Sequence, residues 1–187
     1  MSKELRNKSS LNSMNKDEVK CIRKVVDDSA NLRDQSLFAM LVSGLQEHSF
    51  LGAKASEIKD IATRNRLKAV TIKGGLPLAG DEVGILERYV GAEKLSPDDY
   101  VFPSEHDSKR PMSSRELLRI FKSWEEKAQL PPAKRSPRAL NDFYLMQLIL
   151  ESSKQPSLSD LITAQTGHKS LFMTEHYVQL VSRQRLS

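Results

Sequence analysis

Cysteine is nearly absent from this sequence of 187 residues, and the single Cys21 excludes an intramolecular disulfide and a cysteine metal cluster. Such sparse cysteine is typical of a protein from a reducing cytoplasm. The four histidines show no metal-ligand spacing, so we expect no metal and no cofactor. No run of about 18 apolar residues exists, which argues against a membrane-spanning helix. The polar N-terminus does not resemble a signal peptide.

Basic residues are concentrated in one region. The length fits one domain, the hydrophobic content of 39% suffices for one core, and the formal net charge of +5 mildly favours a nucleic-acid partner. Between residues 109 and 138, nine basic side chains accompany three acidic ones. The basic ones are Lys109, Arg110, Arg115, Arg119, Lys122, Lys127, Lys134, Arg135 and Arg138. This region is either a solvated helix face or a surface for nucleic acid.

The sequence of the first third of the chain predicts a flexible arm followed by helices. Residues 1–15 are rich in Ser, Asn and Lys, and we expect a flexible arm there. Asn15 is predicted to open a helix with Cys21 facing the core, and Asn31 to cap a second helix that ends near Gly44 and the polar residues 46–49. A short helix is expected from there through residue 55. The apolar stripes are Val19, Ile22, Val25 and Val26 in the first helix, and Leu37, Phe38, Leu41, Val42 and Leu45 in the second.

The hydrophobic period then changes from that of a helix to that of a strand. Residues 57–61, 68–73 and 76–78 are candidate strands, and Gly74-Gly75 is a hairpin turn signal. Proline is tolerated in the last of them if it is an edge strand. Lys73 lies at the hairpin tip, either as a plain solvated lysine or as a functional one. We therefore expect a small three-stranded antiparallel sheet.

Further helices are predicted after the hairpin. One begins at Gly80 and continues to about residue 90, and residues 95–111 form a loop around the apolar pair Val101 and Phe102. Ser113 or Ser114 caps the next helix. Its apolar stripe is Leu117, Phe121, Trp124 and Ala128, and its outward face carries Arg115, Arg119 and Lys122.

Ser136-Pro137 is a start signal for a further helix. Arg138 and Asn141 are three residues apart, so we expect them to share one exposed face at the positive end of this helix, which suits a phosphate. With no repeat and no second core, the fold class is mainly α (α+β), as one domain over residues 16–187.

Residues 166–177 combine a helix stop with two side chains that can act together. Gly167 ends a helix, His168 lies on the turn, and Tyr177 follows within the next helix. Histidine and tyrosine placed this way can converge on a small anionic group. Tyrosine acts as a nucleophile only if its proton is withdrawn and a cation receives the charge. The alternative is a surface histidine and a half-buried tyrosine.

The order of these segments resembles the catalytic domain of the tyrosine recombinases, the phage integrase family, from about residue 15 to residue 180. Four segments carry the resemblance: residues 32–45, the hairpin with Lys73 and Gly74, residues 136–141, and residues 167–177, where the tyrosine follows the histidine by nine residues. The resemblance implies transfer of a DNA phosphoryl group to Tyr177, giving a 3′-phosphotyrosyl link. We expect no separate N-terminal DNA-clamping domain of the kind common in this family.

The resemblance also implies two arginines at the reacting phosphate, and both are replaced. Gln46 stands at the first position, and the second pattern, His-x-x-Arg, reads Arg138-x-x-Asn141. Lys73, His168 and Tyr177 match the family pattern, with Arg138 as a fourth candidate catalytic residue. Glutamine and asparagine can donate hydrogen bonds to a phosphate, but they add no charge. We interpret the chain as a degenerate recombinase domain.

Three functions remain open. The first is a DNA-binding regulator or accessory factor of a mobile element that cleaves DNA poorly or not at all. The second is an active recombinase with Tyr177 as nucleophile, and the third is a subunit that pairs with itself or with an active recombinase. Each implies double-stranded DNA as partner, no membrane, and a cytoplasmic, nucleoid-associated location. The candidate DNA-binding residues are Arg115, Arg119, Lys122, Lys134, Arg135, Arg138 and Lys169.

Overall fold

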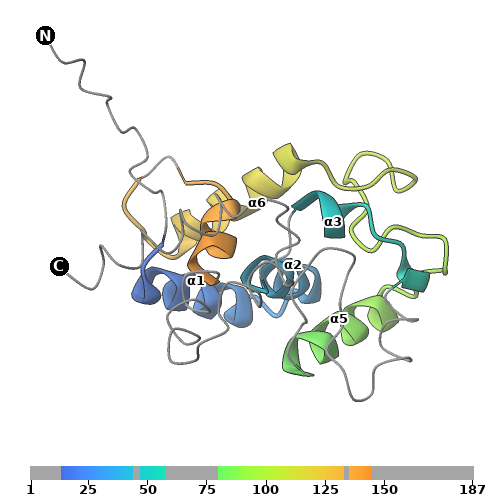
Figure 1. Ribbon diagram of the computed structural model, residues 1–187, viewed down its shortest axis with the longest axis horizontal. Coiled ribbons are helices and arrows are strands. Elements are labelled where there is room, and N and C mark those ends of the chain that lie inside the picture. Colours follow the sequence, from blue (N-terminus) through green and yellow to red (C-terminus); the bar gives the residue numbers. More distant parts are fainter. Residues whose placement is uncertain (1–13, 44–46, 58–79, 133–134, 145–187) are drawn as a thin grey trace, which may run out of the picture.

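The computed structural model describes residues 14–43, 47–57, 80–132 and 135–144, and its named elements are helices. They are α1 (Lys16–Asp28), α2 (Leu32–Val42), α3 (Glu47–Leu51), α5 (Gly80–Ala92) and α6 (Ser114–Lys127). α2 packs against α1 and α5, and α1 packs against α6. Figure 1 shows α2 at the centre, with α5 on one side of it and α6 on the other. The prediction of a mainly helical fold is confirmed.

Local capping explains where the helices begin. The Asn15 side chain accepts hydrogen bonds from the backbone N–H groups of Asp17 and Glu18, and the Glu18 carboxylate accepts from the Asn15 N–H at 2.9 Å. This reciprocal capping box satisfies backbone donors that a helix start leaves without partners. Asn31 caps α2 in the predicted way, at 3.2 Å from the Asp34 N–H. Met14, in the predicted arm, is buried in the core.

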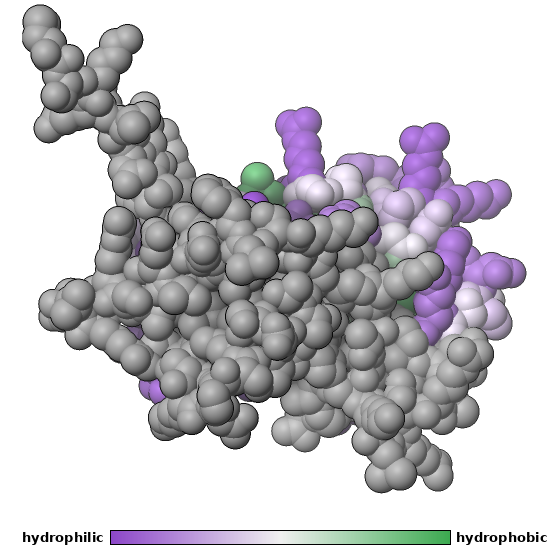
Figure 2. All heavy atoms as spheres, in the orientation of Figure 1, coloured by the Kyte–Doolittle hydropathy of each residue, from purple (hydrophilic) through white to green (hydrophobic). Residues whose placement is uncertain are grey.

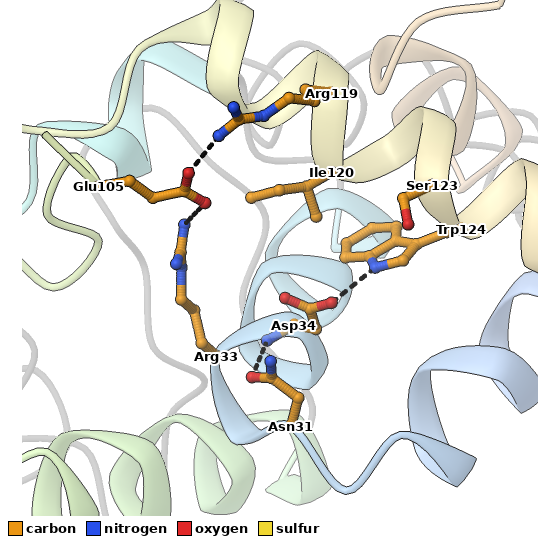
Figure 3. A pocket seen from close by; sticks show the side chains of 8 residues that line it. All are labelled: Asn31, Arg33, Asp34, Glu105, Arg119, Ile120, Ser123 and Trp124. Atoms are coloured by element: carbon orange, nitrogen blue, oxygen red, sulfur yellow. Dashed lines mark hydrogen bonds and ion pairs between the residues drawn. The ribbon is translucent and has the colours of Figure 1, made fainter.

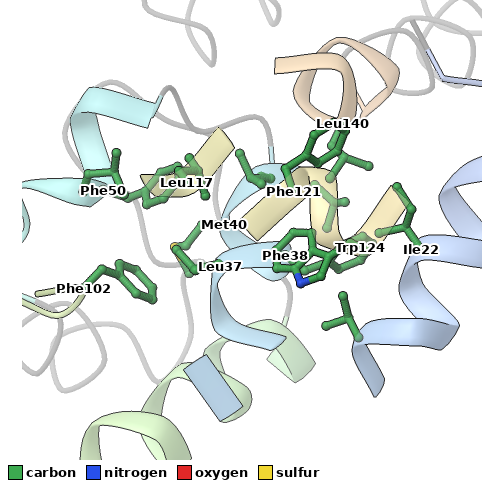
Figure 4. Packing of buried hydrophobic residues seen from close by; sticks show 14 of the residues in the cluster. Ile22, Leu37, Phe38, Met40, Phe50, Phe102, Leu117, Phe121, Trp124 and Leu140 are labelled. Carbon is green, nitrogen blue, oxygen red and sulfur yellow. The ribbon is translucent and has the colours of Figure 1, made fainter. Parts of the chain in front are cut away.

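The core gathers around α2, whose residues from Ser36 to Val42 are all buried. The Phe38 ring meets the Trp124 ring of α6 edge to face, with centroids 6.3 Å apart (Figure 4). Phe102 stacks on Tyr89 at 5.7 Å, so the loop before α6 is fixed to α5 by an aromatic pair. The predicted burial of Leu117, Phe121 and Trp124 is confirmed, and the loop pair Val101-Phe102 is also buried.

One prediction about the first helix is wrong. Cys21 is exposed, because it lies about 100° around the helix from Ile22, on the solvent side of the buried stripe. The second helix ends close to the predicted position, because α2 stops at Val42 with Ser43 as its C-cap. The short helix predicted after it is α3, which ends at Leu51 and not at residue 55, and burial of Phe50 and Leu51 stabilises it.

The predicted three-stranded sheet lies almost wholly outside the described residues. Glu57, the first residue of its first strand, is helical instead, and its carboxylate accepts from the Lys54 N–H at 2.7 Å, as a helix-starting glutamate does. Within the described ranges, β pairing consists of isolated antiparallel bridges between Lys54 and Tyr100 and between Pro103 and Pro111. No helix in those ranges is long and apolar enough to cross a membrane.

Glu116 organises the start of α6. One carboxylate oxygen accepts from the Ser113 N–H and hydroxyl, each at 2.7 Å. The other accepts from the Ser104 hydroxyl at 2.7 Å and the Glu105 N–H at 3.0 Å. These hydrogen bonds, those from Ser113 first, lower the pKa of Glu116 from 4.5 to about 2. One carboxylate therefore caps the helix and anchors the preceding loop.

We expect the Glu116 carboxylate to make the protein sensitive to acid. Its pKa is lower in the folded state, so its contribution to stability is fully present above pH 4.5 and is lost as the pH falls from 4.5 towards 2. Glu116→Gln should lower the melting temperature at pH 7 and flatten its decline across that window. Glu126→Gln, on the exposed side of the same helix, is the matched control. Parallel melting curves for Glu116→Gln and wild type at every pH would contradict this.

Candidate functional site

A helix starts at residue 138, next to the predicted Ser136-Pro137 start signal. The Arg138 side chain is 64% exposed, with its Nε 3.6 Å from Asp142 Oδ1. Asn141 is only 8% exposed. The prediction that Arg138 and Asn141 share one exposed face is therefore wrong. Asn141 is about 60° from Arg138 around the helix and lies on the side that packs against the core. Arg138 is the charged group that this helix start presents to solvent.

The segment after the Gln46 position approaches Arg138. Glu47, the first residue of α3, interacts through its carboxylate with the side chain of Ser114 and with the charge of Arg138. Burial raises the pKa of Glu47, although the Ser114 hydrogen bond and the charges of Arg138 and His48 act to lower it. The start of α3 therefore contacts the start of α6, within range of the charge of Arg138. Sequence reasoning missed Glu47, although its place directly after Gln46 could have indicated it.

The predicted basic residues of α6 lie on one side of the helix. Arg115, Arg119 and Lys122 follow one another at spacings of four and three, and Arg115 and Arg119 are exposed. Arg119 pairs with Glu105, and Lys122 Nζ lies 2.6 Å from Glu125 Oε2. Figure 2 shows long hydrophilic side chains projecting from the upper right of the molecule, where α6 and the loop before it lie in Figure 1. This surface mixes cations with paired carboxylates.

Arg135 has a different setting from Arg115, Arg119, Lys122 and Arg138, the other predicted DNA-binding residues that the structure describes. Its guanidinium bonds to the Glu18 carboxylate of α1, and its Nη1 lies 3.4 Å from Glu125 Oε1 of α6. The three side chains are only 11%, 16% and 9% exposed. Arg135 therefore joins α1, α6 and the segment that leads to Arg138.

The remaining predicted site residues are Gln46, Lys73, Lys134, His168, Lys169 and Tyr177, and they lie outside the described residues. Their roles stay predictions. Among the residues that the structure does describe, no group of three or more His, Cys, Asp or Glu side chains could hold a metal ion.

Comparison with known proteins gives matches among solved structures. No protein-family model matches this sequence, and no curated protein matches it. The chain is similar to the structure of XerA recombinase, with a TM-score of 0.67 and 17% identity over 88% of this chain. It is similar to XerH site-specific recombinase bound to its palindromic difH substrate, with a TM-score of 0.69 and 19% identity over 93% of this chain. It also resembles the Tn1549 transposon integrase in complex with circular intermediate DNA, at 0.65 and 14% over 94%.

These structures support the fold that the sequence resemblance implied. All three are tyrosine recombinases, and the similarity extends over most of this chain. The chain spans 57%, 51% and 64% of their lengths, respectively. At identities below 20%, the likeness shows a recombinase catalytic-domain fold.

Proposed function

We propose that this protein binds double-stranded DNA on a recombinase scaffold, cleaves it poorly or not at all, and acts as a regulator or accessory factor of a mobile element. The observation that carries the proposal is that one helix start combines an exposed arginine, Arg138, with a buried and uncharged residue, Asn141. A phosphate at this position meets one flexible cation and the positive helix end. That chemistry is sufficient for binding the DNA backbone.

Strand cleavage requires more preorganised positive charge at the phosphate than binding does. The transition state of phosphoryl transfer spreads negative charge over oxygens that preorganised cations stabilise. Removing one preorganised donor costs about 10²–10³ in rate, so the two neutral amides at Gln46 and Asn141 cost about 10⁴ or more together. Arg138 supplies one cation and cannot replace two.

An active strand-exchange enzyme is the second candidate function. The feature in its favour is that Lys73, His168 and Tyr177 occupy positions that match the family pattern. In this case Tyr177 attacks the phosphate, and Lys73, Arg138 and His168 assist.

The two functions are separated by trapping a covalent product. We would incubate the protein with a nicked duplex that carries the ends of its own genetic element, and then run a denaturing gel. We expect little or no covalent adduct from wild type. An abundant adduct that disappears in Tyr177→Phe would overturn the cleavage-deficient proposal and establish the active enzyme.

DNA binding itself is tested on native gels at several salt concentrations. We expect a salt-sensitive mobility shift, and Arg138→Gln should reduce the log–log salt slope by about 0.9, the value for one phosphate contact. Arg88→Gln removes an exposed arginine from α5 and is the matched control. Equal slopes for the two variants would exclude Arg138 as a phosphate contact, and the absence of any shift would exclude the DNA-binding function.

A further inference from the structure

An open cleft of about 390 Å³ lies beside the start of α2 and the side of α6. Its lining includes Arg33, Asp34, Glu105, Arg119 and Trp124. Figure 3 shows Arg33 from α2 and Arg119 from α6 reaching the Glu105 carboxylate from opposite sides. Arg33 Nη2 lies 3.5 Å from Glu105 Oε1, and Arg119 bonds to Oε2.

Arg33, Arg119 and Glu105 together carry an excess of positive charge. Two guanidinium groups share one carboxylate, which leaves a formal charge of +1 on the three side chains. Asp34 is the other acid in the lining, so the lining as a whole has no formal net charge, and the Asp34 Oδ2 accepts from the Trp124 indole N–H at 2.8 Å. Arg33 Nε is buried and has no hydrogen-bond partner among the described residues. Glu105 therefore holds the two arginines together while Arg33 keeps one unsatisfied donor.

The Glu105 carboxylate can leave the arginines without displacing its loop. Its own backbone N–H is held by Glu116 Oε1 at 3.0 Å, and the loop is closed by the bridge between Pro103 and Pro111. The side chains of Glu105 and Arg119 are both exposed to solvent, and ion pairs in such positions add little stability. An anion with more oxygens than a carboxylate can compete for both guanidinium groups.

We propose that Arg33 and Arg119 form a second phosphate-contact site, in which a backbone phosphate of double-stranded DNA takes the place of the Glu105 carboxylate. This inference rests on the proposed DNA-binding function. Arg119 lies one turn along α6 from Arg115, about 6 Å, so the two arginines are close enough to contact the same DNA backbone. Glu105 keeps the two arginines together before DNA arrives and lowers the affinity by competing for them.

The test compares two variants that remove one negative charge each. Glu105→Gln frees the arginine pair, whereas Glu87→Gln removes an exposed carboxylate from α5. Fluorescence anisotropy with a labelled duplex should show that Glu105→Gln binds about threefold to fivefold more tightly than Glu87→Gln, as expected for release of one surface ion pair. In an Arg119→Gln background, the advantage of Glu105→Gln should shrink towards zero. Circular dichroism confirms that each variant is folded.

The results of this test separate the second phosphate contact from the DNA-binding function as a whole. A gain for Glu105→Gln that depends on Arg119 supports the second phosphate contact. Equal affinities for Glu105→Gln and Glu87→Gln, or weaker binding by Glu105→Gln, overturn it and leave the proposed DNA-binding function standing. If no protein in the series binds the duplex in a salt-sensitive way, both the site and the proposed function are overturned.

Discussion

Replacing Arg135 by methionine is expected to lower the free energy of unfolding by about 3 kcal/mol, because removal of one partner leaves buried charges uncompensated. The change leaves Glu18 and Glu125 with carboxylates that are only 16% and 9% exposed. Lys122 still reaches Glu125 at 2.6 Å, which keeps the cost at the lower end of the usual range. Glu18 has no such second cation among the described residues.

The control for this change is Arg115→Met, which removes an exposed arginine from α6. Substitutions of this kind usually change stability by less than about 0.5 kcal/mol. Urea denaturation of both variants gives the comparison at constant pH. Similar midpoints for Arg135→Met and Arg115→Met would show that the ion pairs of Arg135 do not stabilise the fold. Arg135 would then remain a candidate DNA-binding residue.

The second large effect concerns chemistry. Replacing Gln46 and Asn141 together by arginine is expected to raise formation of the Tyr177–DNA adduct by at least about 10²-fold, the lower limit for restoring one preorganised donor. A helical side chain leans towards the helix N-terminus, so an arginine at Asn141 extends towards Arg138 and the start of α3. Glu47 lies in that region and offers a counter-charge.

Two controls make this result specific to arginine. The same double change to lysine adds equal charge without the planar fork that binds a phosphate through two parallel hydrogen bonds, so it should restore less cleavage. Adding Tyr177→Phe to the arginine variant should abolish the adduct. A folded arginine variant that forms no more adduct than wild type would show that the missing arginines do not limit cleavage.

Local sequence patterns predicted the helices that have clear caps. Asn15 and Glu18 at the start of α1, and Ser113 and Glu116 at the start of α6, are three residues apart, so their bonds form within a single turn. The buried stripe of α6, ending at Trp124, follows from helical spacing alone. Matching the sequence to the family pattern also predicted which residue stands at each catalytic position, including the neutral amides Gln46 and Asn141.

What the sequence by itself determined is therefore the helical fold class, the capped helices and the identity of the candidate site residues. Tertiary structure decided which way several side chains face. Arg135 bonds to Glu18, 117 residues away, and Arg119 shares Glu105 with Arg33, which is 72 residues from Glu105. A basic residue looks the same in sequence whether it meets a phosphate or a carboxylate. Its partner is fixed only when packing brings distant helices together and makes an unpaired buried charge too costly.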